Sequence, residues 1–326
     1  MKRWEKTGKK TVVVMDSIVN LVVLFILLLL LLFGGYALWD SGQIYKSAGA
    51  DVYSMYKPTA ENTLSFEDLQ AANSDVFGWL TVYGTQIDYP LVQGGTNSKY
   101  LNTNVLGKYA ISGSLFLDYS NSPDFSDFNS FIYGHHMEKN VMFAEIEYFA
   151  DAAYFFGHRY GNLYYDGKDH GVEFFAFLAV DAYDMSVYDV AVPETRSQQY
   201  LDNLLEKAKN VREIDITTSD KIVLLSTCTS ESTNGRHILV GRIDENLYQN
   251  EFEETIKKTD GGFKKGTLAD SGFMALLKHS PMWLWILLIV LLLILALVVY
   301  DKVQKRRARY KQKRKMALSD ECEKKS

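Results

Sequence analysis

One cysteine in the central part of this chain is a candidate nucleophile. Cys228 ends an apolar run that begins at Ile222, and the only other cysteine of the 326 residues, Cys322, lies near the C-terminus. The membrane topology argued below puts these two thiols on opposite sides of a bilayer, so Cys228 would form no intrachain disulfide. A lone thiol in an exterior domain is more often kept for reactivity than for bridging. The alternative is that Cys228 is a small hydrophobic core residue.

A reactive thiol needs a base or a cation beside it, because a free thiol of pKa about 8.5 is only a few per cent ionised at neutral pH. His135 and His136 are the best-placed histidines, since they directly follow an apolar strand ending at Tyr133. Functional residues gather where a strand passes into a loop. The alternatives are a surface turn and a metal site. No metal or other cofactor is expected, because the region lacks a second cysteine and zinc-ligand spacing.

Arg236 lies eight residues after Cys228. A guanidinium stays protonated and cannot act as a base, but it can donate hydrogen bonds to a substrate carbonyl or to a developing oxyanion. An arginine alone is a weak signal, since most are solvated. Cysteine, histidine and arginine together would provide a nucleophile, a proton carrier and an anion-stabilising group.

Two apolar segments are long enough to cross a membrane. Residues 18–39 and residues 282–300 reach roughly 33 and 28 Å as helices, against a hydrocarbon core of about 30 Å. A cleaved signal peptide is the alternative for the first segment, but its apolar core is long and it lacks a clear cleavage site. A buried core helix is the alternative for the second segment, which is apolar on every face and ends in a basic cluster.

The flanking charges predict the orientation of both spans. Basic residues precede the first span and follow the second, and such residues stay on the cytoplasmic side. Both termini are therefore expected inside the cell and residues 40–280 outside, with the basic C-terminal tail also able to contact anionic lipid. Between residues 40 and 280 acidic residues outnumber basic ones by about 15, which argues against a nucleic-acid partner.

The exterior region reads mainly as short β-strands. Runs rich in β-branched and aromatic residues, separated by turn residues, predict a barrel or sandwich. The expected strands are 79–83, 87–92, 113–119, 128–133, 173–182, 221–228 and 238–243. Three helices are expected: one capped by Ser65 and running to about Ala72, one over 141–151 and one over 194–210.

These features together resemble the sortase family, and within it class B. The likeness rests on residues 133–137 (Tyr-Gly-His-His-Met), 225–228 (Leu-Ser-Thr-Cys) and 236–242 (Arg-His-Ile-Leu-Val-Gly-Arg), with support from 77–80, 87–93 and 113–118. It covers about residues 62–245. Its specificity comes from the joint agreement of order, strand context and spacing.

The resemblance implies a mainly β fold with helices, namely an eight-stranded sortase-type barrel, here flanked by two transmembrane helices. It assigns His135, Cys228 and Arg236 as catalytic residues and gives Ser226, Thr227 and Glu231 as possible substrate contacts. The segment 183–215 and the loop between Cys228 and Arg236 would shape the pocket.

The chain is accordingly expected to have seven parts. They are a cytoplasmic N-terminus (1–17), a transmembrane helix (18–39), an extracellular stalk (40–61), the catalytic domain (62–245), an extracellular linker (246–281), a second transmembrane helix (282–300) and a cytoplasmic tail (301–326). A second, C-terminal span is typical of pilin-assembling class C sortases, not of class B.

The implied reaction is a transpeptidation on secreted proteins that carry a C-terminal sorting signal. Cys228 would cleave the signal after threonine and hold the acyl group as a thioester. An amine of a cell-wall precursor would then release the product, and a pilin lysine is the alternative acceptor. Two other functions stay open: an exterior cysteine hydrolase that uses water, and a non-catalytic membrane-tethered binding module.

Overall fold

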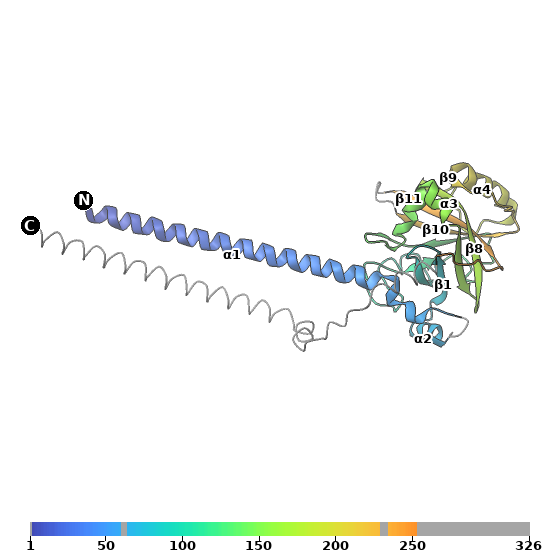
Figure 1. Cartoon of the computed structure of the whole chain (residues 1–326), viewed down its shortest axis with the longest axis horizontal. Helices are drawn as coiled ribbons and strands as arrows, with labels where there is room; N and C mark the ends of the chain where they lie inside the picture. The colour runs from blue at the N-terminus through green and yellow to red at the C-terminus, as the bar shows by residue number, and fades with distance from the viewer. Residues whose placement is uncertain (1, 60–63, 229–233, 253–326) are drawn as a thin grey trace, which may run out of the picture. The chain divides into compact units, whose positions relative to one another are not determined.

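The strands between residues 76 and 244 form a closed β-barrel in the computed structural model, which describes residues 2–59, 64–228 and 234–252. Neighbouring strands run in the order β11-β10-β4-β3-β2-β1-β7-β8, and β8 pairs with β11 to close the ring. Figure 1 labels β1, β8, β10 and β11 of this barrel. The bounds are β1 Val76–Val82, β2 Asp88–Val92, β3 Leu115–Leu117, β4 Asn129–Tyr133, β7 Tyr160–Tyr165, β8 Lys168–Asp181, β10 Lys221–Cys228 and β11 Gly235–Asp244. The expected eight-stranded barrel is therefore confirmed.

The central strands are apolar on both faces because two hydrophobic clusters enclose them. Along β10, Val223 and Leu225 belong to the cluster inside the barrel, while Ile222 and Leu224 belong to a second cluster outside it. The second cluster is covered by helix α4 (Glu194–Lys207) through Leu201, Leu204 and their neighbours. A strand buried on both faces reads as a continuous apolar run, which explains the sequence before Cys228.

Two of the three predicted helices are present, and the prediction of the third is wrong. Helix α2 spans Leu64–Ala72, and α4 stops at Lys207, where β9 (Ala208–Val211) begins and pairs with β8. The helix expected over 141–151 is instead a two-residue strand, β6 (Val141–Met142), followed by a 3-10 helix, η3 (Ala144–Ala150). β6 pairs with β5 (His136–Met137), and Met142 has φ of 58°, a value that no α-helix accommodates. Helix α3 (Ala152–Gly157) follows, capped by Asp151.

The N-terminal helix α1 spans Lys2–Ala48, and its residues 18–48 are long and apolar enough to cross a membrane. The helix continues beyond residue 39, where the first span was expected to end, and two 3-10 turns follow at Ala50–Val52 and Ser54–Tyr56. The end of α1 contacts the barrel, because the Tyr89 hydroxyl donates to the carbonyl of Ala48 at 3.1 Å. The second predicted span, 282–300, lies outside the described residues, and the seven-part division remains a prediction.

Candidate active site

Three adjacent strands carry the predicted catalytic residues to one end of the barrel. β10 lies between β4, which is parallel to it, and β11, which is antiparallel. The β4–β10 register joins Asn129 to Ile222 and Tyr133 to Ser226, a constant separation of 93 residues. The last paired residues, Tyr133 and Ser226, each stand two positions before a predicted catalytic residue, His135 and Cys228. In the other direction the Cα of Cys228 is paired with that of Arg236. Cys228 and Arg236 therefore lie side by side in the sheet, and His135 follows the end of the strand on the other side of β10.

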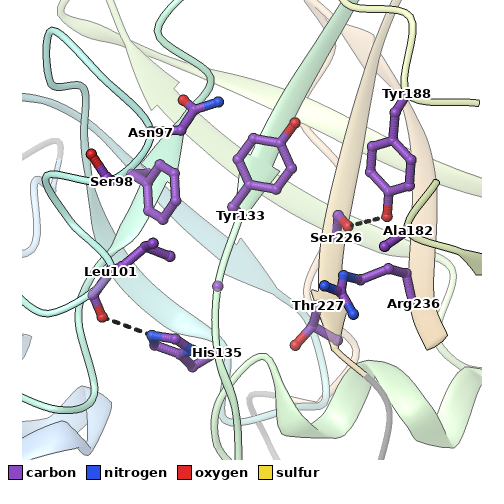
Figure 2. Close-up of a pocket in the computed structure, with 12 residues that line it drawn as sticks. Asn97, Ser98, Leu101, Tyr133, His135, Ala182, Tyr188, Ser226, Thr227 and Arg236 are labelled. Atoms are coloured by element: carbon purple, nitrogen blue, oxygen red, sulfur yellow. Dashed lines mark hydrogen bonds between the residues drawn. The ribbon is translucent and has the colours of Figure 1, made fainter. Parts of the chain in front are cut away.

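A pocket of about 490 Å³ opens at this end of the barrel. Figure 2 shows Asn97, Ser98 and Leu101 on one side and Ser226, Thr227, Arg236 and Tyr188 on the other, with Tyr133 between them. His135 also lines the pocket, so the structure brings together four of the six predicted site residues: His135, Ser226, Thr227 and Arg236. For Cys228 the structure describes the backbone pairing, and Glu231 lies outside the described residues.

The two neighbouring histidines have different partners. The Nε2 atom of His135 lies 2.7 Å from the carbonyl oxygen of Leu101, and a carbonyl oxygen can only accept, so Nε2 carries the proton in this arrangement. Nδ1 is then the nitrogen left to exchange protons in the pocket. His136 instead pairs with Glu147 at 2.9 Å through its own Nε2 atom. His135 therefore lines the pocket, and His136 is hydrogen-bonded to Glu147 outside it.

The backbone before His135 is tightly packed. A Cβ atom added at Gly134 would lie 2.4 Å from Cδ2 of Leu115 and 2.7 Å from Cδ2 of Phe143. No side chain fits at such distances, so glycine lets the chain leave β4 close to β3. The amide of Phe143 also donates to the carbonyl of His135 at 3.0 Å. These contacts hold the histidine backbone against the barrel end.

The wall formed by β10 offers two hydroxyl groups to the pocket. The Ser226 hydroxyl lies 2.9 Å from that of Tyr188, in the segment that leads to α4. Thr227 is buried, and its hydroxyl has no hydrogen-bond partner in the described part of the chain. A buried hydroxyl without a partner costs free energy.

Arg236 is the residue with a permanent charge among the described residues that line the pocket. Its Nη1 donates to its neighbour's carbonyl, that of Gly235, at 2.8 Å. Because no carboxylate belongs to the described lining, the guanidinium can direct its positive charge and remaining donors toward a substrate oxygen.

Sequence reasoning missed the wall opposite β10. Asn97, Ser98 and Leu101 lie in the segment between β2 and β3, which had been assigned no role. Tyr188 falls within the 183–215 segment expected to shape the pocket. No sequence pattern identifies Asn97 or Leu101 as pocket residues, because they line the pocket only when the segment between β2 and β3 crosses the end of the barrel. In the described residues no cluster of three histidine, cysteine or acidic side chains is arranged to hold a metal, and the absence of cofactors remains a prediction.

Comparisons with known proteins agree with this geometry, although no family model matches the chain. Sortase B of Listeria monocytogenes is 33% identical over 179 residues, which cover 54% of this chain and 72% of that protein. Sortase B from the type II pilus of Streptococcus pneumoniae is 48% identical, with a TM-score of 0.50, covering 56% of this chain and 99% of that structure. A Streptococcus pyogenes class B sortase involved in pilus biogenesis is 40% identical, with a TM-score of 0.52, covering 56% and 98%. In sequence and in barrel topology, the chain belongs to the sortase family, class B.

Proposed function

We propose that the chain is a membrane-anchored cysteine transpeptidase that acts on secreted proteins with a C-terminal sorting signal. The proton of the Cys228 thiol passes to His135, and the sulfur attacks the carbonyl carbon of a threonine in the signal to form a tetrahedral intermediate. The carbon–nitrogen bond then breaks, the departing amine takes that proton from His135, and a thioester remains on Cys228. An incoming amine attacks the thioester carbon and gives a proton to His135. The carbon–sulfur bond breaks and the released sulfur takes that proton back, so two acyl transfers replace one direct amide exchange.

The observation that supports this proposal is that His135 and Arg236 line one pocket, while the backbone of Cys228 is paired with that of Arg236 beside it. His135 donates through Nε2 to Leu101, so the proposed proton carrier is Nδ1. Arg236 supplies a permanent positive charge to the carbonyl oxygen as it becomes an oxyanion. Ser226 and Thr227 offer hydroxyl groups to the peptide from the same strand, and Glu231 is proposed as a further contact.

The acceptor amine is proposed to be a pilin lysine. Sequence reasoning ranked an amine of a cell-wall precursor first and the pilin lysine second. Two solved relatives, described as a type II pilus sortase and as a sortase involved in pilus biogenesis, share more sequence with this chain than the Listeria protein does. That difference supports the lysine, and the cell-wall amine becomes the competing outcome of the test.

The proposed location is the cell membrane, with the barrel outside. Helix α1 supplies the first span, and its continuation to Ala48 would hold the barrel close to the membrane surface. The second span at 282–300 and the cytoplasmic position of both termini are proposed from hydropathy and flanking charge alone.

The test is to trap the acyl-enzyme and then vary the acceptor. The full chain, purified in lipid nanodiscs, is mixed with peptides from sorting signals of secreted proteins encoded beside its gene, and its intact mass is measured. A Cys228 adduct is expected for the wild type and for Cys322→Ala, the matched control for the other thiol, but not for Cys228→Ala. A chain that forms no adduct and keeps unreactive thiols would instead be a binding module.

The acceptor is identified by adding amines to the trapped adduct. Release by a pilin peptide that contains lysine, with formation of a new amide, supports the proposal. Faster release by an amine peptide of a cell-wall precursor reassigns the acceptor. Release at the same rate with and without amine, giving only the free acid, would make the protein a hydrolase.

A further inference from the structure

A buried carboxylate lies directly behind the pocket wall that sequence reasoning missed. Asp118 follows β3 and is 3% exposed. Its Oδ2 accepts hydrogen bonds from the Tyr133 hydroxyl at 3.1 Å and from Nδ2 of Asn97 at 2.7 Å. Its Oδ1 accepts the backbone N–H of Ser120 at 2.9 Å. Asp118 does not line the pocket, but two of its three donors do.

The contacts of Asn97 determine which way its amide group faces. Nδ2 must point to Asp118, because a carboxylate accepts only, and Oδ1 must point to the backbone N–H of Tyr119, 2.9 Å away, because that group donates only. One N–H and one oxygen lone pair of Asn97 then remain for the pocket. This donor and acceptor pair is complementary to a peptide amide.

The hydroxyl of Tyr133 is held in the same way. It gives its only proton to Asp118, so its oxygen offers only lone pairs to the pocket. Burial, with the charge of Asp118 and the hydrogen bond to it, raises the pKa of Tyr133, which keeps the hydroxyl protonated. The backbone of Asp118 is fixed as well, since Nε2 of Gln93 donates to its carbonyl at 2.8 Å.

We propose that Asp118 is a positioning residue that sets the hydrogen-bond pattern of the pocket, by orienting the Asn97 amide and making the Tyr133 hydroxyl an acceptor. A sorting peptide would place an amide group against Asn97 and an N–H donor against Tyr133. This inference rests on the proposed function for its substrate, although the orientation of Asn97 can be measured without any activity.

The substitution Asp118→Asn tests this role because it preserves shape and removes two acceptor positions. If the new amide oxygen replaces Oδ2, its NH₂ group faces the N–H of Ser120. If the oxygen replaces Oδ1, the NH₂ group faces Nδ2 of Asn97. Turning Asn97 over then brings its own NH₂ group against the N–H of Tyr119. The first arrangement leaves the N–H of Ser120 unpaired and replaces the charged acceptor of Asn97 with a weaker neutral oxygen, and the other two leave Asn97 or Tyr119 with an unpaired donor. In every case Asn97 is held less firmly than in the wild type.

The matched control is Asp127→Asn. Asp127 lies in the same loop, and its carboxylate accepts two hydrogen bonds, from Nδ2 of Asn121 at 3.0 Å and from the N–H of Ser122 at 2.8 Å, where that of Asp118 accepts three. The substitution Asp127→Asn removes the same negative charge as Asp118→Asn, at a residue that does not line the described pocket. Both variants are made in the full chain, and their thermal unfolding is compared first to show that each is folded.

The expected result is a rise of about tenfold in KM for acyl-enzyme formation in Asp118→Asn, with kcat and the alkylation rate of Cys228 nearly unchanged. Asp127→Asn should change KM less than threefold. Combined with Asn97→Ala and Tyr133→Phe together, Asp118→Asn should add little to the effect of those two substitutions, because it acts through those two side chains. Independent, multiplying effects on KM would overturn the proposal.

A second measurement separates this inference from the proposed function. The side-chain amide signal of Asn97, identified by its loss in Asn97→Ala, is recorded by ¹⁵N NMR in the full chain. One of its two protons should be shifted downfield by the carboxylate in the wild type and should move upfield in Asp118→Asn, where a neutral oxygen or no acceptor replaces the carboxylate. A wild-type signal like that of a solvated asparagine would overturn the role of Asp118, even if peptides are captured. A bonded signal in a chain that captures no peptide would count against the proposed function alone.

Discussion

The Nε2 atom of His135 lies 2.7 Å from the carbonyl oxygen of Leu101. This hydrogen bond joins the end of β4 to the segment between β2 and β3, two parts of the chain separated by 34 residues. It selects one tautomer of the imidazole and leaves Nδ1 for proton transfer. A backbone carbonyl therefore orients this ring, and no side chain at position 101 is needed for that bond.

Replacing His135 should remove the proton carrier while the neighbouring histidine is dispensable for chemistry. His135→Asn is expected to lower kcat/KM for acyl-enzyme formation by roughly 10²–10⁴. His136→Asn should reduce it only a few-fold, because His136 pairs with Glu147 away from the pocket. Rates measured by intact mass on both variants give the comparison, and equal losses would show that the two histidines have been assigned wrongly.

Substitutions of the two arginines of β11 should have different effects, one on the rate of catalysis and the other on the free energy of unfolding. Arg236→Ala is expected to lower kcat by about 10²–10³, the loss typical of an oxyanion donor, with little change in unfolding. Arg242 instead donates to the buried carboxylate of Glu173 at 2.8 Å, so Arg242→Ala should lower the free energy of unfolding by about 1–3 kcal/mol.

Denaturant unfolding and peptide turnover on the same samples check both arginine variants. Loss of stability in Arg236→Ala without loss of kcat would contradict the assigned role of that residue. Arg236→Lys should fall between wild type and alanine, because lysine keeps the charge without the planar donor pair.

The hydroxyl of Tyr89 should stabilise the hairpin that follows His135. It accepts the N–H of Met142 at 3.0 Å and donates to the carbonyl of Ala48 at 3.1 Å. Tyr89→Phe leaves both groups without this partner, and we expect a loss of about 1–3 kcal/mol in the free energy of unfolding. Tyr148→Phe, which removes an exposed hydrogen bond to Asn140, should cost about 0.5 kcal/mol or less. Equal urea midpoints of unfolding for Tyr89→Phe and Tyr148→Phe would show that the Tyr89 hydroxyl does not stabilise this hairpin.

The stability of the barrel should depend on pH through His170. This side chain is 4% exposed and stacks on Tyr165 with 3.8 Å between the ring centroids. Burial lowers the pKa of His170, so below its unfolded pKa of about 6.5 the unfolded chain binds the proton more readily than the folded one. The free energy of unfolding should therefore fall as the pH drops below about 6.5, by at most about 1.4 kcal/mol per pH unit.

The variant His170→Phe keeps an aromatic ring on Tyr165 and removes the titrating group. Its free energy of unfolding should decline less between pH 7 and pH 5 than that of the wild type, as measured by urea unfolding at each pH. Parallel pH profiles for the two proteins would mean that His170 takes up no additional proton on unfolding.

Local patterns in the sequence were enough to predict where several helices and strands lie. β10 has the bounds 221–228 expected from its apolar run, because a strand enclosed by two clusters needs apolar residues at every position. β4 ends at Tyr133 as expected, so His135 could be assigned to the end of a strand. β11 begins at Gly235, three residues before the expected strand 238–243, and so includes Arg236. The length and composition of residues 18–39 predicted a helix able to span a membrane, and α1 contains them.

Other local signals were present but unused or misleading. Asp166 and Gly167, with φ of 51° and 74°, form the two-residue turn between β7 and β8, and Asp-Gly is a strong hairpin signal. Reading it would have revealed β7. The apolar spacing of Met142, Ile146 and Phe149 suggested an α-helix, but pairing of β6 with β5 prevails over that spacing.

The sequence by itself determined the candidate chemistry: a thiol, an imidazole and a guanidinium at strand ends, with 93 residues between the first two positions. Only the tertiary structure decided which groups surround them. The closure of β8 on β11, the bond from Leu101 to His135 and the placement of Asn97 by Asp118 all join residues distant in the chain. Local patterns report burial and backbone preference, whereas such contacts depend on how the barrel closes and how its loops cross one end.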